Sequence, residues 1–130
     1  MNSQLEGETL DEVAKTYQAL TGERQKISGQ LRDLLQALFE GEENLIVELP
    51  WQEMLQGRNH TINQILVHGI EGKRIYFSNP LKRGNEQPGM QIEGEGCGPQ
   101  RQIHANGIQS MELETFRQLF HQSGQALLPD

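Results

Sequence analysis

Two stretches in the middle of the chain decide the fold: NQILVHGI at 63–70 and KRIYFSNP at 73–80. Both are rich in β-branched and aromatic residues, and Glu71-Gly72 between them is typical of a tight turn. They therefore predict a hairpin with strands at 61–70 and 73–77. Working outward, NLIVEL at 44–49 is closed by Pro50 and predicts a further strand.

Helices are expected on both sides of these strands. Thr9 and Glu12 have the spacing of a capping box, and Gly22 supplies a stop. Residues 80–100 are rich in glycine and proline and predict a long loop. In chain order, the expected elements are helices at 9–20 and 27–39, strands at 44–49, 61–70, 73–77, 90–93 and 101–104, and a helix between a capping Ser110 and Gly124. This order predicts an α+β fold: N-terminal helices packed on a small antiparallel sheet with a C-terminal helix.

Length and charge limit the classes of function. The chain has 130 residues, with 11 basic against 18 acidic side chains and a net charge of -7. We expect a single domain over 1–130, with loose termini at 1–8 and 125–130, and neither nucleic acid nor membrane as a partner. The acidic start does not resemble a signal peptide and the apolar runs are short, so a cytoplasmic protein is expected.

Metal and cofactor sites are not expected. The four histidines are scattered without a close ligand spacing: His60, His68, His104 and His121. The single cysteine, Cys97, excludes an internal disulfide and lies between glycines, where His60 or His104 could activate it in a rearranged thiol hydrolase. The alternative is a surface thiol, because the acidic neighbours of Cys97 disfavour the thiolate. Trp51, the only tryptophan, is either partial core or a binding anchor.

The two central stretches resemble the second lobe of papain-like cysteine peptidases, in particular the bacteriocin-processing (double-glycine leader) type from bacteria. The leucine-rich helix before 44–49 resembles that family's helix leading into a Val- and Ile-rich strand. Residues 107–116 resemble its closing turn and helix. The resemblance implies a papain-like lobe in which a histidine begins the first hairpin strand and an Asp or Asn after the second strand orients it.

The catalytic residues of that family are missing here. The histidine position falls on Asn63, whose amide has no titratable nitrogen, and the orienting position falls on Asn79. His60 lies three residues upstream, an odd offset that points it to the other face of a regular strand. The first 20 residues contain no cysteine to serve as the nucleophile. The resemblance thus implies a peptidase-like fold without peptidase activity, a pseudoenzyme.

Three functions follow from these observations. The first is an intracellular peptide- or protein-binding or scaffolding module, with a groove near Trp51, Asn63 and Asn79. The second is the thiol hydrolase built on Cys97. The third is a subunit that docks on a partner through the helices at 9–39, or that completes a hydrolase site with another chain. The partner is then a peptide, a protein or a second copy of this chain, and no cofactor is expected.

Overall fold

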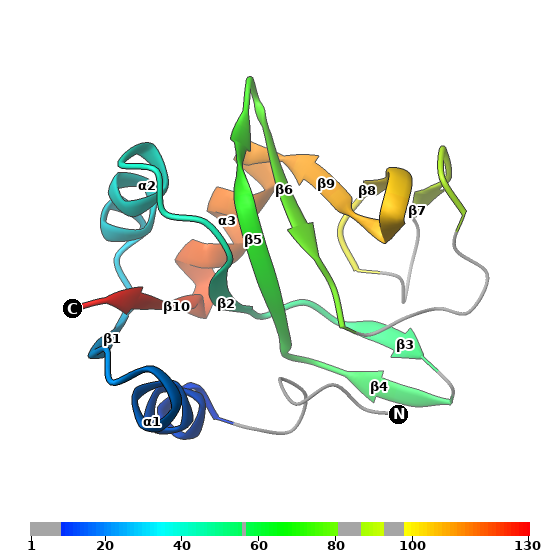
Figure 1. Ribbon diagram of the computed structural model, residues 1–130. Helices are drawn as coiled ribbons and strands as arrows, with labels where there is room; N and C mark the ends of the chain where they lie inside the picture. Colours follow the sequence, from blue (N-terminus) through cyan, green and yellow to red (C-terminus); the bar gives the residue numbers. More distant parts are fainter. Residues whose placement is uncertain (1–8, 56, 81–86, 93–97) are drawn as a thin grey trace.

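A large antiparallel sheet is the centre of the fold (Figure 1). The computed structural model describes residues 9–55, 57–80, 87–92 and 98–130, and these form a mixed α+β structure. The helices are α1 (Leu10–Thr21), α2 (Leu31–Phe39) and α3 (Leu113–Ser123), and a short 3-10 helix covers Ala105–Gly107. The strands are β1 (Gln25–Ser28), β2 (Leu45–Leu49), β3 (Glu53–Leu55), β4 (Arg58–His60), β5 (Asn63–Glu71), β6 (Arg74–Ser78), β7 (Gln91–Ile92), β8 (Arg101–Ile103), β9 (Gln109–Glu112) and β10 (Gln125–Pro129).

Eight of these strands pair in the order β1-β10-β2-β5-β6-β9-β8-β7, while β3 and β4 form a separate hairpin. The expected α+β class is confirmed, but the sheet is larger than the sequence predicted. Strands β1, β3, β4, β9 and β10 were not expected. Strands β1 and β10 extend the sheet beyond β2, β9 lies between β6 and β8, and β3 and β4 form the hairpin that links β2 to β5.

The central hairpin is confirmed. Strands β5 and β6 pair with Glu71 opposite Arg74, so the two-residue turn is Gly72-Lys73, one position later than predicted. Gly72 has a φ of 62°, a left-handed conformation that glycine adopts without strain. The register shifts between Val67 and Gly69, which marks a β-bulge on β5.

The first helix begins and ends as predicted. Thr9 Oγ1 accepts a hydrogen bond from the Glu12 backbone N–H at 3.2 Å, and Gly22 closes the helix with a φ of 78°. The second helix begins at Leu31 instead of residue 27. Ile27 belongs to β1, because β10 offers this segment an antiparallel partner with Ile27 opposite Leu127.

Two expectations for the last quarter of the chain are wrong. Ser110 does not cap a helix: it lies in β9, opposite Tyr76 of β6, and α3 begins three residues later. Residues 125–129 are not a loose terminus, because they form β10 between β1 and β2. The three consecutive residues Ala126, Leu127 and Leu128 are all buried, which is typical of a strand covered on both faces. The other expected loose segment, 1–8, lies outside the described residues.

Helices cover both faces of the sheet unequally. The core joins α2 and α3 to one face of the central strands and includes Leu34, Val47, Ile65, Phe77, Phe116 and Phe120. Figure 1 shows α3 behind the sheet, where it contacts β2 and β6. Strand alternation points Leu127 to the opposite face, where α1 packs on β1 and β10 and buries Leu10 and Val13. Among the described residues, no helix packs on the outer face of β5, β6 and β9.

Candidate functional site

Asn63 occupies the position that the resemblance assigns to the general base. It begins β5 opposite Leu49 and is only 1% exposed. Its Nδ2 donates a hydrogen bond to the Trp51 carbonyl oxygen at 3.0 Å. Its Oδ1 is also buried and has no hydrogen-bond partner among the described residues. The side chain is thus fixed by the segment between β2 and β3 and does not face solvent.

Asn79, the expected orienting residue, lies one position beyond β6. Leu66 pairs with Ser78, so continuing the register places Asn79 opposite Ile65. Asn63 and Asn79 therefore share a face of the hairpin as diagonal neighbours. Both are 1% exposed, so this shared face is the buried one. Neither side chain is exposed to solvent, and the expected groove beside them stays a prediction.

Trp51 is part of a buried polar cluster and is not a surface anchor. Its ring is 3% exposed, and its Nε1 donates to Glu53 Oε1 at 3.0 Å. The Arg101 guanidinium lies 4.9 Å from the ring centroid and forms an ion pair with Glu53 Oε2 at 3.1 Å. Arg101 Nη1 also donates to Gln109 Oε1 at 3.2 Å. This cluster ties the β3–β4 hairpin to β8 and β9 and consolidates the region around Asn63.

The residues of the expected thiol hydrolase lie in different surroundings. His60 is half-buried in β4, opposite Glu53. His104 follows β8; its Nε2 lies 2.7 Å from Ser110 Oγ, and its ring packs on Tyr76 at 5.2 Å between centroids. Cys97 lies outside the described residues. The contacts of His104 are therefore those of a histidine held against β6 and β9.

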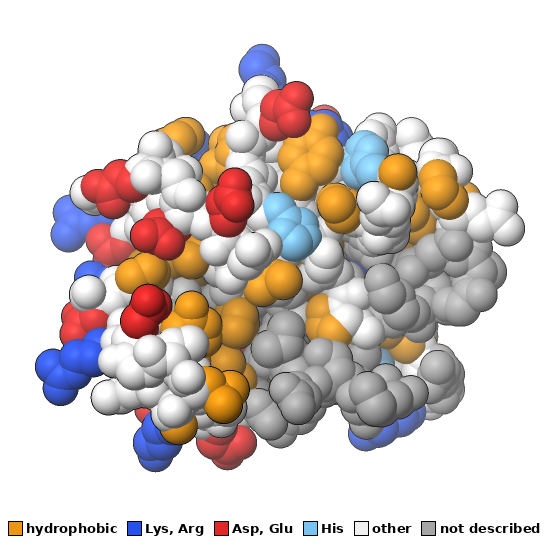
Figure 2. Space-filling view, viewed as in Figure 1, with side chains coloured by type: hydrophobic (Ala, Val, Ile, Leu, Met, Phe, Trp, Pro, Cys, Tyr) orange, Lys and Arg blue, Asp and Glu red, His pale blue; other side chains and the backbone are white. Residues whose placement is uncertain are grey.

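A second polar arrangement, which the sequence analysis missed, lies on the outer face of the sheet. His68 Nδ1 lies 2.7 Å from Asn44 Oδ1, and His68 Nε2 lies 2.7 Å from Ser78 Oγ. With its proton on Nδ1, the imidazole donates to Asn44 Oδ1 and accepts from the Ser78 hydroxyl. Ser78, His68 and Asn44 are then arranged like a nucleophile, a base and an amide that orients the base. Figure 2 shows histidine side chains on this face of the molecule. His68 lies at the bulge of β5, which no sequence pattern located.

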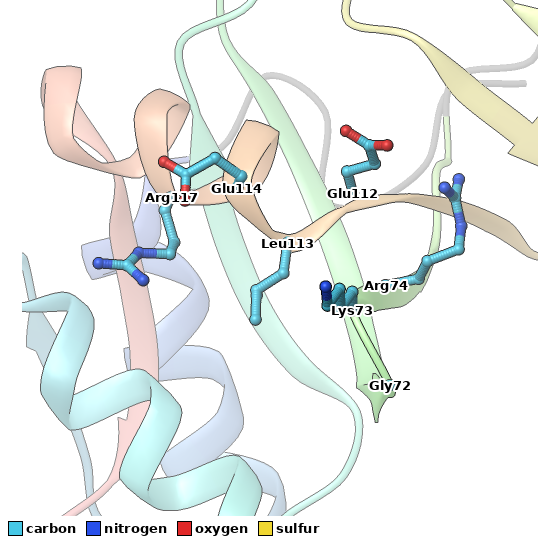
Figure 3. A pocket seen from close by; sticks show the side chains of 7 residues that line it. All are labelled: Gly72, Lys73, Arg74, Glu112, Leu113, Glu114 and Arg117. Atoms are coloured by element: carbon cyan, nitrogen blue, oxygen red, sulfur yellow. The ribbon is translucent and has the colours of Figure 1, made fainter.

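A pocket of about 350 Å³ lies where the β5–β6 turn meets the start of α3. Its described lining consists of Gly72, Lys73, Arg74, Glu112, Leu113, Glu114 and Arg117 (Figure 3). Charged groups of both signs surround the apolar Leu113, whose backbone N–H donates to the Lys73 carbonyl oxygen at 2.8 Å. This described lining contains no serine, cysteine or histidine, so it provides no nucleophile and base pair.

Comparison of the chain with protein-family models, with curated proteins and with solved structures gave no match. Within the described ranges, no three His, Cys, Asp or Glu side chains gather in a way that could hold a metal ion. In the same part of the chain, no helix has both the length and the apolar composition that crossing a membrane requires. The function must therefore be argued from the arrangement of the described residues.

Proposed function

We propose that this chain is a non-catalytic, papain-like domain that binds an extended peptide or protein segment. The arrangement of elements supports this proposal. A leucine-rich helix, α2, leads into β2, the β5–β6 hairpin follows, and α3 closes the unit. The two positions that the resemblance singles out, Asn63 and Asn79, share one face of that hairpin, as the family's pattern requires.

One observation carries the non-catalytic part of the proposal: the contacts of Asn63. A general base must exchange a proton with the nucleophile, and a carboxamide has no titratable nitrogen. The Asn63 amide instead donates to the Trp51 carbonyl oxygen inside the protein. Removing one member of a nucleophile and base pair removes most of the catalysis, because the two act as a unit.

Peptide arrays read by mass spectrometry test both parts of the proposal. The purified chain is incubated with an array of random peptides, and the bound peptides are analysed for cleavage, before and after alkylation of the protein with iodoacetamide. We expect binding without cleavage, unchanged by alkylation of Cys97. Cleavage that alkylation abolishes would establish the thiol hydrolase instead. Failure to bind any peptide would overturn the binding module.

A second candidate function is supported by the Ser78–His68–Asn44 arrangement: hydrolysis of an activated ester. Ser78 Oγ would attack the carbonyl carbon while His68 Nε2 takes the hydroxyl proton and passes it to the leaving alcohol. Water would then release the acid and restore Ser78. A fluorophosphonate probe, which reacts with activated serines, distinguishes this candidate. Labelling that is lost in Ser78→Ala supports hydrolysis, and an unlabelled protein rejects it.

A further inference from the structure

The turn that joins β8 to β9 contains the pair Asn106-Gly107. Both residues have a positive φ, 63° for Asn106 and 76° for Gly107. The Ile108 backbone N–H closes the turn by donating to the Ala105 carbonyl oxygen at 3.4 Å. Positive φ at both central residues is the pattern of a type I′ hairpin turn, which favours Asn-Gly because these residues tolerate the left-handed conformation. The hairpin therefore explains why this pair stands here.

The Asn106 side chain is open to water. The residue is exposed, and no hydrogen bond joins its side chain to another described residue. Figure 1 shows this turn beyond the ends of β8 and β9, on the side of the molecule opposite to α1 and α2. The bond that closes the turn, from Ile108 N–H to the Ala105 carbonyl oxygen, is long at 3.4 Å. The turn therefore opens at little cost in free energy, and the Asn106 backbone then leaves the left-handed conformation.

An exposed asparagine that precedes glycine reacts with its own main chain. The Gly107 backbone nitrogen attacks Asn106 Cγ, and Gly107 has no Cβ to obstruct this approach. A bond forms between that nitrogen and Cγ, the bond from Cγ to the side-chain nitrogen breaks, and the side-chain nitrogen leaves as ammonia with the proton of the Gly107 amide. Water then opens the cyclic succinimide. Cleavage of the ring at Cγ gives aspartate, and cleavage at the backbone carbonyl carbon gives isoaspartate.

Asn44 is the matched comparison within the same chain. It is also exposed and left-handed, with a φ of 60°. However, its Oδ1 lies 2.7 Å from His68 Nδ1, and the residue that follows it is Leu45. Leu45 begins β2 and is 6% exposed, so its backbone is fixed in the sheet and its nitrogen is shielded by a branched side chain. The following glycine and the unbonded amide are thus what distinguish Asn106.

We propose that Asn106 is a modification site, at which this reaction replaces the asparagine with aspartate and isoaspartate as the protein ages. Isoaspartate adds one carbon to the main chain of the turn. The ends of the turn are joined by a bond from the His104 N–H to the Ile108 carbonyl oxygen at 2.7 Å, and Ile103 pairs with Gln109 just beyond it. A longer main chain does not fit this closure, so isoaspartate loosens β8 from β9. Aspartate leaves the length of the main chain unchanged.

Peptide mapping by mass spectrometry tests the reaction. Trypsin releases residues 102–117, in which Asn106 is the only asparagine, and residues 33–58, in which Asn44 is the only asparagine. The purified protein is kept in neutral buffer for several weeks and sampled at intervals. We expect peptide 102–117 to gain the mass of an amide-to-acid exchange at least about tenfold faster than peptide 33–58, and to separate into aspartate and isoaspartate forms. Fragment ions locate the change at Asn106.

Two variants separate the reaction from its structural effect. Asn106→Gly removes the reacting amide and suits the left-handed conformation, so it should fold and stay unmodified. Asn106→Asp carries the charge of the product without the added main-chain carbon. We expect the isoaspartate form, isolated by ion-exchange chromatography, to unfold about 3–5 °C below the fresh protein, and Asn106→Asp to unfold with the fresh protein. Trp51 fluorescence follows this change, because the Arg101 guanidinium of β8 lies 4.9 Å from the Trp51 ring centroid.

Three results would overturn the inference. If a synthetic peptide of residues 102–117 is converted while the folded protein is not, the turn protects Asn106. If Asn44 reacts as fast as Asn106, the argument from Gly107 and the unbonded amide is wrong. If the isoaspartate form unfolds like Asn106→Asp, the longer main chain does not loosen β8. The proposed peptide-binding function does not depend on any of these results, because its assay uses fresh protein.

Discussion

The buried Glu53–Arg101 ion pair makes a strong prediction about stability. The two side chains are 1% and 0% exposed, and Arg101 Nη2 lies 3.1 Å from Glu53 Oε2. Glu53→Gln keeps the shape of the side chain and an acceptor for Trp51 Nε1, but it removes the carboxylate charge that faces the buried guanidinium. Breaking a buried pair in this way lowers the free energy of unfolding by about 3–5 kcal/mol.

The expected effect is large for a chain of this size. An unfolding entropy of about 2.1 cal/mol/K per residue converts a loss of about 3–5 kcal/mol into a fall of about 10–20 °C in Tm. Trp51 is the only tryptophan and lies beside the pair, so its fluorescence follows unfolding at this place. Thermal and urea unfolding are measured by that signal and by circular dichroism, which reports the whole sheet.

Two further variants separate the charge effect from other causes. Combining Glu53→Gln with Arg101→Met removes both charges, so the double variant should recover much of the stability lost in the single variant. Asp11→Asn breaks the exposed Lys15–Asp11 pair, whose side chains are 77% and 70% exposed, and should leave Tm unchanged. A fall of less than about 2 °C in Glu53→Gln would refute the reasoning, because Tm shifts of that size correspond to surface substitutions.

Three smaller predictions concern local geometry, each checked by thermal unfolding. A Cβ at Gly124 would lie 2.7 Å from the Phe120 Cα, so Gly124→Ala should cost about 1–3 kcal/mol, whereas Gly69→Ala, which meets nothing within 4 Å, is the tolerated control. His68→Ala removes both 2.7 Å contacts on the outer face and should cost about 1–3 kcal/mol; an unchanged Tm would mean that these contacts do not stabilise the fold. Thr9→Ala removes the α1 cap and should cost about 1 kcal/mol, and equal stability would show that this helix end is not held by the cap.

The elements with local signals were predictable from the sequence. The hairpin of β5 and β6 is rich in β-branched and aromatic residues and has a glycine at its turn, and α1 has a capping pair and a terminal glycine. In contrast, β1 and β10 depend on each other. Gln25–Ser28 has one strongly apolar residue, and Gln125–Pro129 resembles a tail until its partner is known. Each segment becomes a strand only through pairing across about a hundred residues, which no local pattern encodes.

Some features of the candidate site around Asn63 could be predicted from the sequence, and others could not. The predicted turn at Glu71-Gly72 would have placed Asn79 opposite Gln64, so the face that Asn79 shares with Asn63 depends on the later turn and on the bulge, which the sequence did not reveal. Their burial was not predictable, because it accompanies the Trp51, Glu53 and Arg101 cluster, whose members come from segments 50 residues apart in the chain. Arginine is almost never fully buried unless it is paired, so the sequence alone predicts an exposed Arg101. Only the structure, which places Glu53 beside it, explains its burial.

The position of β10 has a consequence for how the protein is made. Because β10 lies between β1 and β2, those two strands cannot join the same sheet until residues 125–129 have left the ribosome. Until then the edge of β2, with its LIVEL sequence, stays open, and such an edge can pair with other nascent chains. Contacts so distant in sequence also slow folding, since the long loop must close before they form. Synthesis of β10, and not of the central hairpin, therefore sets the moment at which the edge of β2 is covered.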